Sequence, residues 1–224
     1  EVRSARIKSV DANTRRWAEF PSLFQADRQP GTDYLLVPKV SSERRKYVPL
    51  GFCPPNLIVN PTVLVVPGAT LFHFGVLQSA MHMAWMRYTA GRMKSDYQYS
   101  NTIVYNNFPW PQTLTAPQKQ AIEDAAQAVL DARTRFPDSS LADLYDPLTM
   151  PPALTKAHQK LDAAVDTAYA KRKFNGDSER VTFLFALYQQ LISPLAALAT
   201  KPTRRRKSHS DPVKKTKSFR SPTV

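Results

Sequence analysis

The eight residues VYNNFPWP (residues 104–111) separate two parts of the sequence that differ in pattern. Pro109 and Pro111 lie two positions apart, and each lacks a backbone N–H and has a fixed φ angle. Two prolines this close together end any regular secondary structure. We therefore place a domain boundary here, with one domain over residues 1–112 and a second over residues 113–200.

Upstream of the boundary, short runs of strand-forming residues alternate with turn residues. The runs cover residues 34–37, 46–50, 57–59, 63–66 and 70–74, and glycine and proline separate them. This pattern predicts a small, mainly antiparallel β-sheet. Residues 76–88 instead have helical periodicity, which predicts a helix inserted into the β domain. Residues 1–30 read as an irregular, basic lead-in.

Downstream of the boundary, start signals followed by apolar periodicity predict four helices. Thr115 and Gln118 have the spacing of a capping box, with a proline in the first turn. Residues 138–140 (Asp-Ser-Ser) cap a short second helix, and the prolines at 151–152 open a third. Residues 177–178 (Asp-Ser) begin the last helix. Together these helices predict a small bundle.

The fold class that follows is α+β. It consists of a small, mainly antiparallel β domain with an inserted helix, followed by a C-terminal helical bundle. Residues 201–224 are rich in Lys, Arg, Ser, Thr and Pro, which predicts a disordered basic tail.

Composition limits the class of protein. Hydrophobic residues make up 42% of the 224 residues, which is ordinary for a globular protein. The single cysteine, Cys53, excludes an intrachain disulfide and favours a reducing compartment, so we expect a cytoplasmic protein. No apolar run approaches the length of a membrane span. The charged start at Glu1 does not resemble a signal peptide and lacks Met, which suggests a piece excised from a longer protein.

The net charge of +13 is unevenly distributed. Residues 1–112 contain 13 Lys and Arg against 7 Asp and Glu, and residues 201–224 contain 9 against 1, whereas residues 113–200 contain 9 against 10. Cationic surfaces attract polyanions through counterion release. Simple solubilising charge is the alternative explanation, and charge alone leaves it open.

Six segments carry a resemblance to a known family: TDYLLVP (32–38), VSSERRKY (40–47), FHFG (72–75), GRMKSDYQYS (91–100), VYNNFPWP (104–111) and LADLYDPLTMPP (141–152). The chain resembles, over nearly all of residues 3–195, the MmeI-like type IIL/IIG restriction-modification proteins and their methylase-only relatives. In that family one polypeptide carries an adenine methyltransferase domain, a target recognition domain and a C-terminal helical domain, and many members add an N-terminal nuclease.

The resemblance implies a function and partners. It identifies this chain as a bacterial target recognition domain plus helical domain, which reads double-stranded DNA for an adenine-N6 DNA methyltransferase. The catalytic domain, with its S-adenosylmethionine, would lie upstream in the same polypeptide. DNA and that upstream domain are therefore the expected partners, and no membrane is expected.

The resemblance also implies which side chains read bases, namely Lys94, Asp96 and Gln98. A lysine can donate to guanine acceptors, an aspartate can accept from the cytosine amino group, and a glutamine can bridge adenine. In an extended loop, these three side chains would point toward one groove. The alternative is a helix-terminal loop in which Lys94 and Asp96 pair with each other.

A second group of residues suits DNA phosphates, which position a protein without reading sequence. It contains Ser41, Ser42, Arg44, Arg45 and Lys46, to which we add Arg92. A solvated hairpin on a basic surface is the alternative. Weaker candidates are Arg87, Arg15 and Arg16.

Several other residues invite a functional interpretation that we do not favour. The rings of Phe108 and Trp110 could stack on a flipped base, but rings between prolines more often fill the seam between domains. The histidines at 73, 82 and 158 lack partners at metal-ligand spacing, so core or surface roles are expected. Cys53 is interpreted as a small apolar residue.

Motifs for catalysis are missing from the sequence. Amino-methyltransferases use Asn or Asp followed by Pro-Pro and an aromatic residue, which hold an extruded base. Residues 53–56 (Cys-Pro-Pro-Asn) and 150–153 (Met-Pro-Pro-Ala) lack both the polar first residue and the aromatic last one. No glycine-rich strand–loop–helix is available for S-adenosylmethionine, and the Asp residues are too scattered for a nuclease metal site. We therefore expect no catalysis, cofactor or metal in this fragment, and the parent protein to be the enzyme.

Two other functions remain open. The chain could be a stand-alone basic nucleic-acid-binding or assembly protein without an enzymatic role, in which the tail dominates affinity. It could also be a scaffold that only docks on its own methyltransferase domain, which suits the near-neutral residues 113–200.

Overall fold

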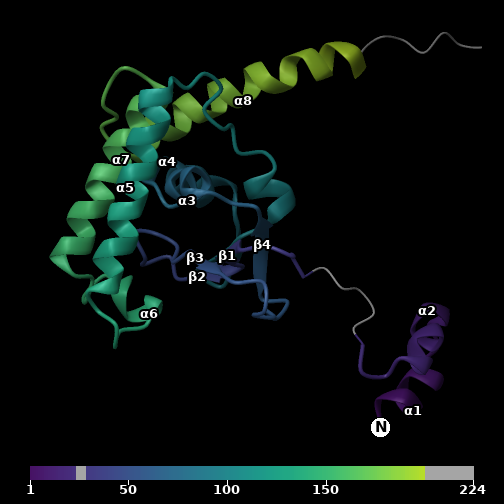
Figure 1. The fold of residues 1–224 in the computed structure, drawn as a ribbon. Helices are drawn as coiled ribbons and strands as arrows, with labels where there is room; N and C mark the ends of the chain where they lie inside the picture. Colours follow the sequence, from purple (N-terminus) through teal and green to yellow (C-terminus); the bar gives the residue numbers. More distant parts are fainter. Residues whose placement is uncertain (24–28, 200–224) are drawn as a thin grey trace, which may run out of the picture.

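The computed structural model describes residues 1–23 and 29–199, with side chains described as far as residue 193 (Figure 1). The predicted disordered tail at 201–224 lies outside these residues. Small antiparallel sheets are followed by a helical C-terminal region, so the predicted α+β class is confirmed.

The N-terminal segment is helical, where an irregular lead-in was expected. It contains α1 (Val2–Ile7), α2 (Ala12–Arg16) and the 3-10 turn η1 (Trp17–Glu19). Asp11 caps α2 by accepting a hydrogen bond from the backbone N–H of Thr14 at 2.7 Å. The Arg6 guanidinium donates to the carbonyls of Trp17 and Phe20, which ties α1 to η1. These local contacts were not visible as apolar periodicity. Figure 1 shows this segment apart from the main body.

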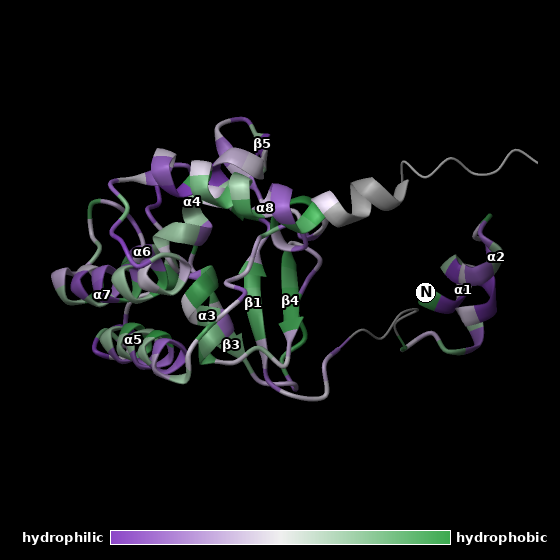
Figure 2. Ribbon diagram, turned by 90° about the horizontal axis from the view of Figure 1, so that it is seen from above, coloured by the Kyte–Doolittle hydropathy of each residue, from purple (hydrophilic) through white to green (hydrophobic). Residues whose placement is uncertain are grey.

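The first sheet has the order β3-β1-β4 and is antiparallel. Its strands are β1 (Tyr34–Pro38), β3 (Gly51–Cys53) and β4 (Val63–Pro67). Leu35 pairs with Phe52 on one side and with Val66 on the other. Figure 2 colours β1 and β4 as hydrophobic, in keeping with strands whose inner face is buried. The runs at 34–37 and 63–66 were predicted correctly as strands.

Three of the predicted strands are wrong. Residues 57–59 contain no strand, and residues 46–50 form no strand either, although residues 47–50 are largely buried. Residues 70–74 instead begin the helix α3 (Leu71–Leu77). The reason is a capping box in which the His73 side chain accepts from the backbone N–H of Thr70 at 3.1 Å. This capping decides the local structure against the strand propensity of the aromatic residues.

The helix predicted over residues 76–88 is interrupted: residues 76–77 belong to the end of α3, and a separate helix begins at residue 80. After α3, Gln78 and Ser79 break the helix, and α4 (Ala80–Thr89) begins with Ser79 as its N-cap. The Ser79 hydroxyl accepts from the backbone N–H of His82 at 3.4 Å. The break places the Gln78 side chain inside the protein, where it is used as described below.

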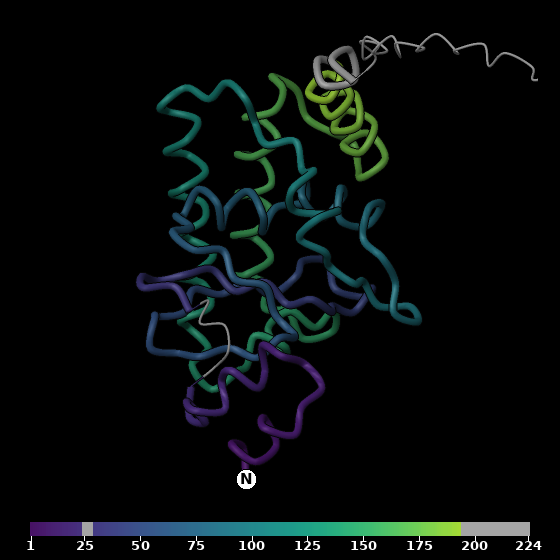
Figure 3. The backbone as a smooth tube through the Cα atoms, turned by 90° about the vertical axis from the view of Figure 1, so that its right-hand side faces the viewer, coloured from purple at the N-terminus to yellow at the C-terminus, as the bar shows by residue number. Residues whose placement is uncertain are grey.

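All four predicted C-terminal helices are present: α5 (Ala116–Thr134), α6 (Leu141–Leu144), α7 (Pro152–Tyr169) and α8 (Asp177–Ala199). The capping box at the start of α5 forms as expected, because Thr115 and Gln118 exchange hydrogen bonds. Helices α5 and α7 lie side by side, as Figures 1 and 3 show, and α8 packs on α4.

One continuous apolar core joins the two halves of the chain. It contains Leu35 from the first sheet, Phe74 and Met81 from α3 and α4, and Ile122 and Leu161 from α5 and α7. Helix α3 packs directly on α5. The core therefore crosses the proline segment at 109–111, and the division at residue 112 stays a prediction about sequence organisation.

The buried segment at 47–50 has backbone polar groups that are bonded by side chains. The Gln78 amide donates to the Val48 carbonyl at 2.8 Å and accepts from the Leu50 N–H at 3.2 Å. The Arg133 guanidinium of α5 donates to the Leu50 carbonyl at 2.7 Å. Because buried backbone groups must be paired, these contacts replace the strand that the sequence pattern predicted.

Gly75 provides a test of this packing. A Cβ atom at this position would lie 2.8 Å from Ile122 and 3.2 Å from Ala126, both on α5. We expect Gly75→Ala to lower the free energy of unfolding by about 1–3 kcal/mol, because overpacking outweighs the gain in helix propensity. Urea unfolding measures this, with Gly31→Ala as control, since a Cβ there meets nothing within 4 Å. Equal stabilities of the two variants would contradict the close contact of α3 with α5.

Candidate nucleic-acid interface

A second sheet brings both groups of predicted DNA-contacting residues together. It has the order β2-β6-β5 and consists of β2 (Val40–Ser41), β6 (Asp96–Gln98) and β5 (Gly91–Met93). Val40 pairs with Gln98 and Ser41 with Tyr97, antiparallel. The loop that follows β2 therefore runs beside β6 toward the tip of the β5–β6 hairpin. Figure 2 shows β5 at the edge of the body, beyond α4 and α8.

The predicted reading loop is a tight hairpin instead of an extended loop. Met93 pairs with Asp96, so Lys94 and Ser95 form a two-residue turn. Asp96 and Gln98 are two apart on β6 and share one face, whereas Tyr97 between them is 6% exposed and faces the core. Lys94 lies at the tip with a φ of 57°, so it stands outside this alternation.

The positive φ of Lys94 is unusual for a residue other than glycine. Such a conformation costs on the order of 1–3 kcal/mol, and strained residues of this kind cluster at functional sites. The turn places the exposed Lys94 at the tip of the hairpin. In the described part of the chain, Lys94 forms no ion pair with Asp96, so the pairing that was the alternative for this loop is not observed.

Arg92 braces the hairpin. Its guanidinium lies 4.0 Å above the centre of the Tyr97 ring and donates to the Ser95 carbonyl at 2.8 Å. It also lies 3.5 Å from the carboxylate of Glu43 in the neighbouring loop. Sequence reasoning missed Glu43, because this contact depends on the register of β2 against β6. Arg92 thus fixes the turn that presents Lys94 and links it to the loop at 42–46.

The loop at 42–46 presents cations beside the hairpin tip. Ser42 starts a turn in which its carbonyl accepts from the Arg45 N–H at 3.1 Å and its hydroxyl accepts from the Arg44 N–H at 3.4 Å. Arg44 is exposed and Arg45 half-buried, and neither side chain bonds to another described residue. The exposed Lys46 ammonium lies 5.4 Å from the centre of the Tyr47 ring. Backbone bonds thus fix the loop while leaving both guanidiniums unpaired.

Ser41 differs from its neighbours. Its side chain is 4% exposed, and its hydroxyl has no hydrogen-bond partner among the described residues. In this position it lies under the sheet surface, whereas Ser42 lies nearer the solvent.

Two of the weaker cationic candidates, Arg87 and Arg15, have structural partners. Arg87 pairs with Asp177 and donates to the Lys46 carbonyl at 3.0 Å. Arg15 donates to the carbonyls of Ser9 and Val10. Both guanidiniums are thus occupied within the chain.

The aromatic pair in the VYNNFPWP segment fills the space between helices. Phe108 is buried, and its ring lies edge-on to His82 of α4 at 4.6 Å between ring centres. It also meets Tyr169 of α7 at 6.4 Å. Trp110 packs on Phe72 and His73. These contacts match the seam interpretation of the two rings.

The buried histidines have structural surroundings. Burial lowers the pKa of His82 to about 3, and its Nε2 pairs with the Tyr99 hydroxyl at 2.9 Å. Burial, with a smaller effect of the nearby Arg133, also lowers the pKa of His158 to about 3. No group of three or more metal-binding side chains gathers within residues 1–23 and 29–199.

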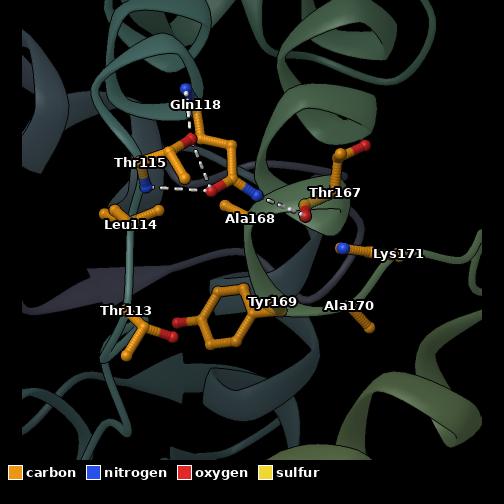
Figure 4. Close-up of a pocket in the computed structure, with 9 residues that line it drawn as sticks. All are labelled: Thr113, Leu114, Thr115, Gln118, Thr167, Ala168, Tyr169, Ala170 and Lys171. Atoms are coloured by element: carbon orange, nitrogen blue, oxygen red, sulfur yellow. Dashed lines mark hydrogen bonds between the residues drawn. The ribbon is translucent and has the colours of Figure 1, made fainter.

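Two pockets lie beside α7. Figure 4 shows a pocket of about 360 Å³ between the start of α5 and the end of α7, where Gln118 bonds to Thr115 and Thr167. Lys171 is its only charged lining residue. In a second pocket, of about 780 Å³, Asp166 is paired with Arg180, and Asp162 accepts a hydrogen bond from Tyr47.

The described residues also do not fit S-adenosylmethionine. One strand leads through a glycine into a helix, from β4 through Gly68 to α3. That turn has a single glycine, and β4 is an edge strand of an antiparallel sheet. A dinucleotide-type cofactor instead needs a glycine-rich turn at the end of a parallel strand. Within the described part of the chain, no helix is long and apolar enough to cross a membrane.

Comparisons with known proteins agree with this architecture. A solved structure, described as the type IIL restriction-modification enzyme MmeI in complex with DNA, is 47% identical with a TM-score of 0.80. The match covers 86% of this chain and 26% of the solved one. DNA methyltransferase A of Bacillus subtilis (strain 168) is 41% identical over 187 residues. That match covers 83% of this chain and 21% of the relative, so the chain spans about a quarter or less of both.

Family models extend over almost all of the described residues. The model of the MmeI target recognition domain matches residues 1–112. The model of the MmeI C-terminal domain matches residues 114–196. The chain therefore belongs to the MmeI family, of which it carries the target recognition and C-terminal regions.

Proposed function

We propose that this chain recognises a specific sequence in double-stranded DNA on behalf of an adenine-N6 DNA methyltransferase. The observation that carries the proposal is the second sheet, which places the hairpin tip beside the loop at 42–46. The tip presents Lys94, and the loop presents Arg44 and Arg45 without partners among the described residues. A base-reading tip flanked by phosphate-binding cations is the arrangement that sequence-specific DNA binding requires.

The roles of individual residues follow from their places in the sheet. Lys94 at the tip, and Asp96 and Gln98 on one face of β6, would contact base edges in the major groove. Ser42, Arg44, Arg45 and Lys46 would contact phosphates. Arg92 would act by holding the turn. The phosphate contact predicted for Ser41 is not proposed again, because its side chain is 4% exposed.

The methyltransferase chemistry would belong to another part of the polypeptide. The MmeI family supports a catalytic domain upstream that binds S-adenosylmethionine and grips the DNA together with this chain. Residues 1–112 would form the reading domain and residues 113–200 the helical domain. The described residues would then have no catalytic role, and the protein would act in the bacterial cytoplasm, where DNA is accessible.

A charge exchange at the hairpin tests the reading role. The gene that encodes this chain, with its upstream coding sequence, is expressed in a methylation-free host, and modified adenines are mapped by long-read sequencing. We expect Lys94→Glu with Asp96→Arg to change one position of the methylated motif, because donor and acceptor are exchanged. Exchanging the ion pair of the exposed Lys119 and the half-buried Glu123 on α5 is the control and should leave the motif unchanged.

Two negative outcomes have different meanings. A motif that survives the hairpin exchange unaltered would refute the hairpin as the reading element. Complete absence of modified adenine with the unaltered gene would refute the methyltransferase assignment and favour the stand-alone basic binder.

The strained turn gives a second prediction. Lys94→Gly removes the ammonium and also the strain of a side chain at positive φ. Because glycine makes the unfolded chain more flexible, the two effects oppose each other, and the free energy of unfolding should stay within about 1 kcal/mol of the original. Discrimination between the cognate base and its alternatives should fall by about 1–3 kcal/mol. Lys94→Val removes the same ammonium but should also destabilise the chain, since a β-branched residue tolerates this φ poorly. Unfolding curves and competition binding separate the effects, and unchanged discrimination in Lys94→Gly would contradict base contact by Lys94.

Salt dependence tests the phosphate loop. Each phosphate contact contributes about 0.9 to the slope of log K against log salt concentration. We expect Arg44→Gln with Arg45→Gln to make this slope shallower by up to about 1.8 and to weaken binding to all duplex sequences alike. Lys160→Gln on the exposed side of α7 serves as the control. A slope equal to the control's would remove both arginines from the interface.

The same titration examines the alternative in which residues 201–224 dominate affinity. Under our proposal, a chain without these residues still prefers the cognate duplex. Loss of all binding and of any duplex preference would favour the stand-alone binder.

A further inference from the structure

The C-terminal helices hold the end of the proposed phosphate loop. The Lys46 carbonyl accepts a hydrogen bond from the Arg87 guanidinium of α4 at 3.0 Å, and Arg87 is itself paired with Asp177 at the start of α8. The last residue of the loop is thereby bonded to a side chain that two helices fix in place. The loop's cations extend from a backbone that the helices anchor.

The next residue, Tyr47, is anchored to α7. Its side chain is 1% exposed, and its hydroxyl donates to the Asp162 carboxylate at 2.6 Å. Its ring stacks on His158, one helical turn earlier on α7, with 4.0 Å between ring centres and 18° between the planes. Burial and the neighbouring Asp162 raise the pKa of Tyr47 well above its usual value, so the hydroxyl stays protonated and continues to donate.

Asp162 also fixes the start of α4. Its second carboxylate oxygen accepts from the backbone N–H of Ala80, the first residue of that helix, at 2.7 Å. Helix α4 ends at Thr89 and leads directly into β5 of the hairpin. One carboxylate on α7 thus bonds to both structural elements that carry the proposed interface, the loop through Tyr47 and the hairpin through α4.

We propose that Tyr47 and Asp162 are positioning residues, through which α7 sets the phosphate loop in a fixed relation to the reading hairpin. This inference rests on the proposed function. It gives the C-terminal helices a role in DNA recognition although they need not touch DNA. The shared acceptor adds to the pairing of β2 with β6 and to the Arg92–Glu43 contact, because Tyr47 cannot shift against the start of α4 without straining one of the two hydrogen bonds of Asp162.

A pair of matched variants tests the inference. Tyr47→Phe removes the hydroxyl that donates to Asp162 and keeps the ring that stacks on His158. Tyr169→Phe removes a buried hydroxyl of the same kind, which donates to the Pro109 carbonyl at 2.9 Å, far along the chain from the loop. Both are made in the full chain and measured with a duplex DNA of mixed sequence. Arg87→Lys is a third variant, which keeps the charge but loses the guanidinium fork that holds the Lys46 carbonyl.

The expected result is a shallower salt slope, by up to about 0.9, and three- to tenfold weaker binding for Tyr47→Phe, with the same direction for Arg87→Lys. Amide hydrogen exchange at residues 42–46 should become faster in both variants and stay unchanged in Tyr169→Phe. Thermal unfolding measures the general loss of stability, which Tyr47→Phe and Tyr169→Phe should share.

The outcomes separate this inference from the function on which it rests. If Arg44→Gln with Arg45→Gln reduces the slope while Tyr47→Phe behaves like Tyr169→Phe in slope and exchange, the positioning role is refuted and the phosphate loop stands. If neither the arginine variants nor Tyr47→Phe alters the slope, the phosphate loop itself is refuted, and the positioning role with it.

Discussion

The burial of residues 47–50 is the constraint on which the rest of the structure depends. A segment without a strand partner can enter a core only if side chains bond to its backbone groups. Gln78 and Arg133 provide these bonds from two different parts of the chain, the break between α3 and α4 and the last turn of α5. This requirement explains why the helical region shares one core with the first sheet. It also explains why the start of this segment can carry an ordered surface loop.

Arg133 is a buried cation whose described hydrogen bonds all go to neutral groups. Its guanidinium donates to the Leu50 carbonyl and to the Tyr145 hydroxyl, and it lies 5.1 Å from the centre of the Phe74 ring. The Tyr145 hydroxyl can donate in turn to Nε2 of His158 at 2.7 Å only if that nitrogen is unprotonated. The lowered pKa of His158 satisfies this condition, because burial, and then the positive charge of the nearby Arg133, disfavour the protonated ring. The hydrogen bond from Tyr145 to His158 therefore requires a neutral imidazole.

The sequence predicted the helical half better than the β half, for a physical reason. Caps such as Thr115 and Ser140 act within four residues, so they are visible in a window of sequence. The conformation of residues 46–50 depends instead on hydrogen bonds to side chains 28 or more positions away, which a local sequence pattern cannot predict. The candidate site behaves in the same way. The residue types at 42–46 and 94–98 were recognisable, whereas the contact between Glu43 and Arg92 required the register of β2 against β6.

In the β5–β6 hairpin, a buried residue, Tyr97, supports an exposed tip at Lys94. Under the proposed function, this arrangement affects how the DNA specificity of such a chain can change. The side chains of Lys94 and Gln98 are exposed, so replacing them costs little stability as long as the residue at position 94 tolerates its φ of 57°. Tyr97, Arg92 and the network beneath them hold the hairpin regardless of which side chains stand at its tip. Base preference can then vary by substitution at the tip while the backbone geometry persists. A reading element that were part of the core would not have this freedom, since each new side chain would have to fit a packed interior.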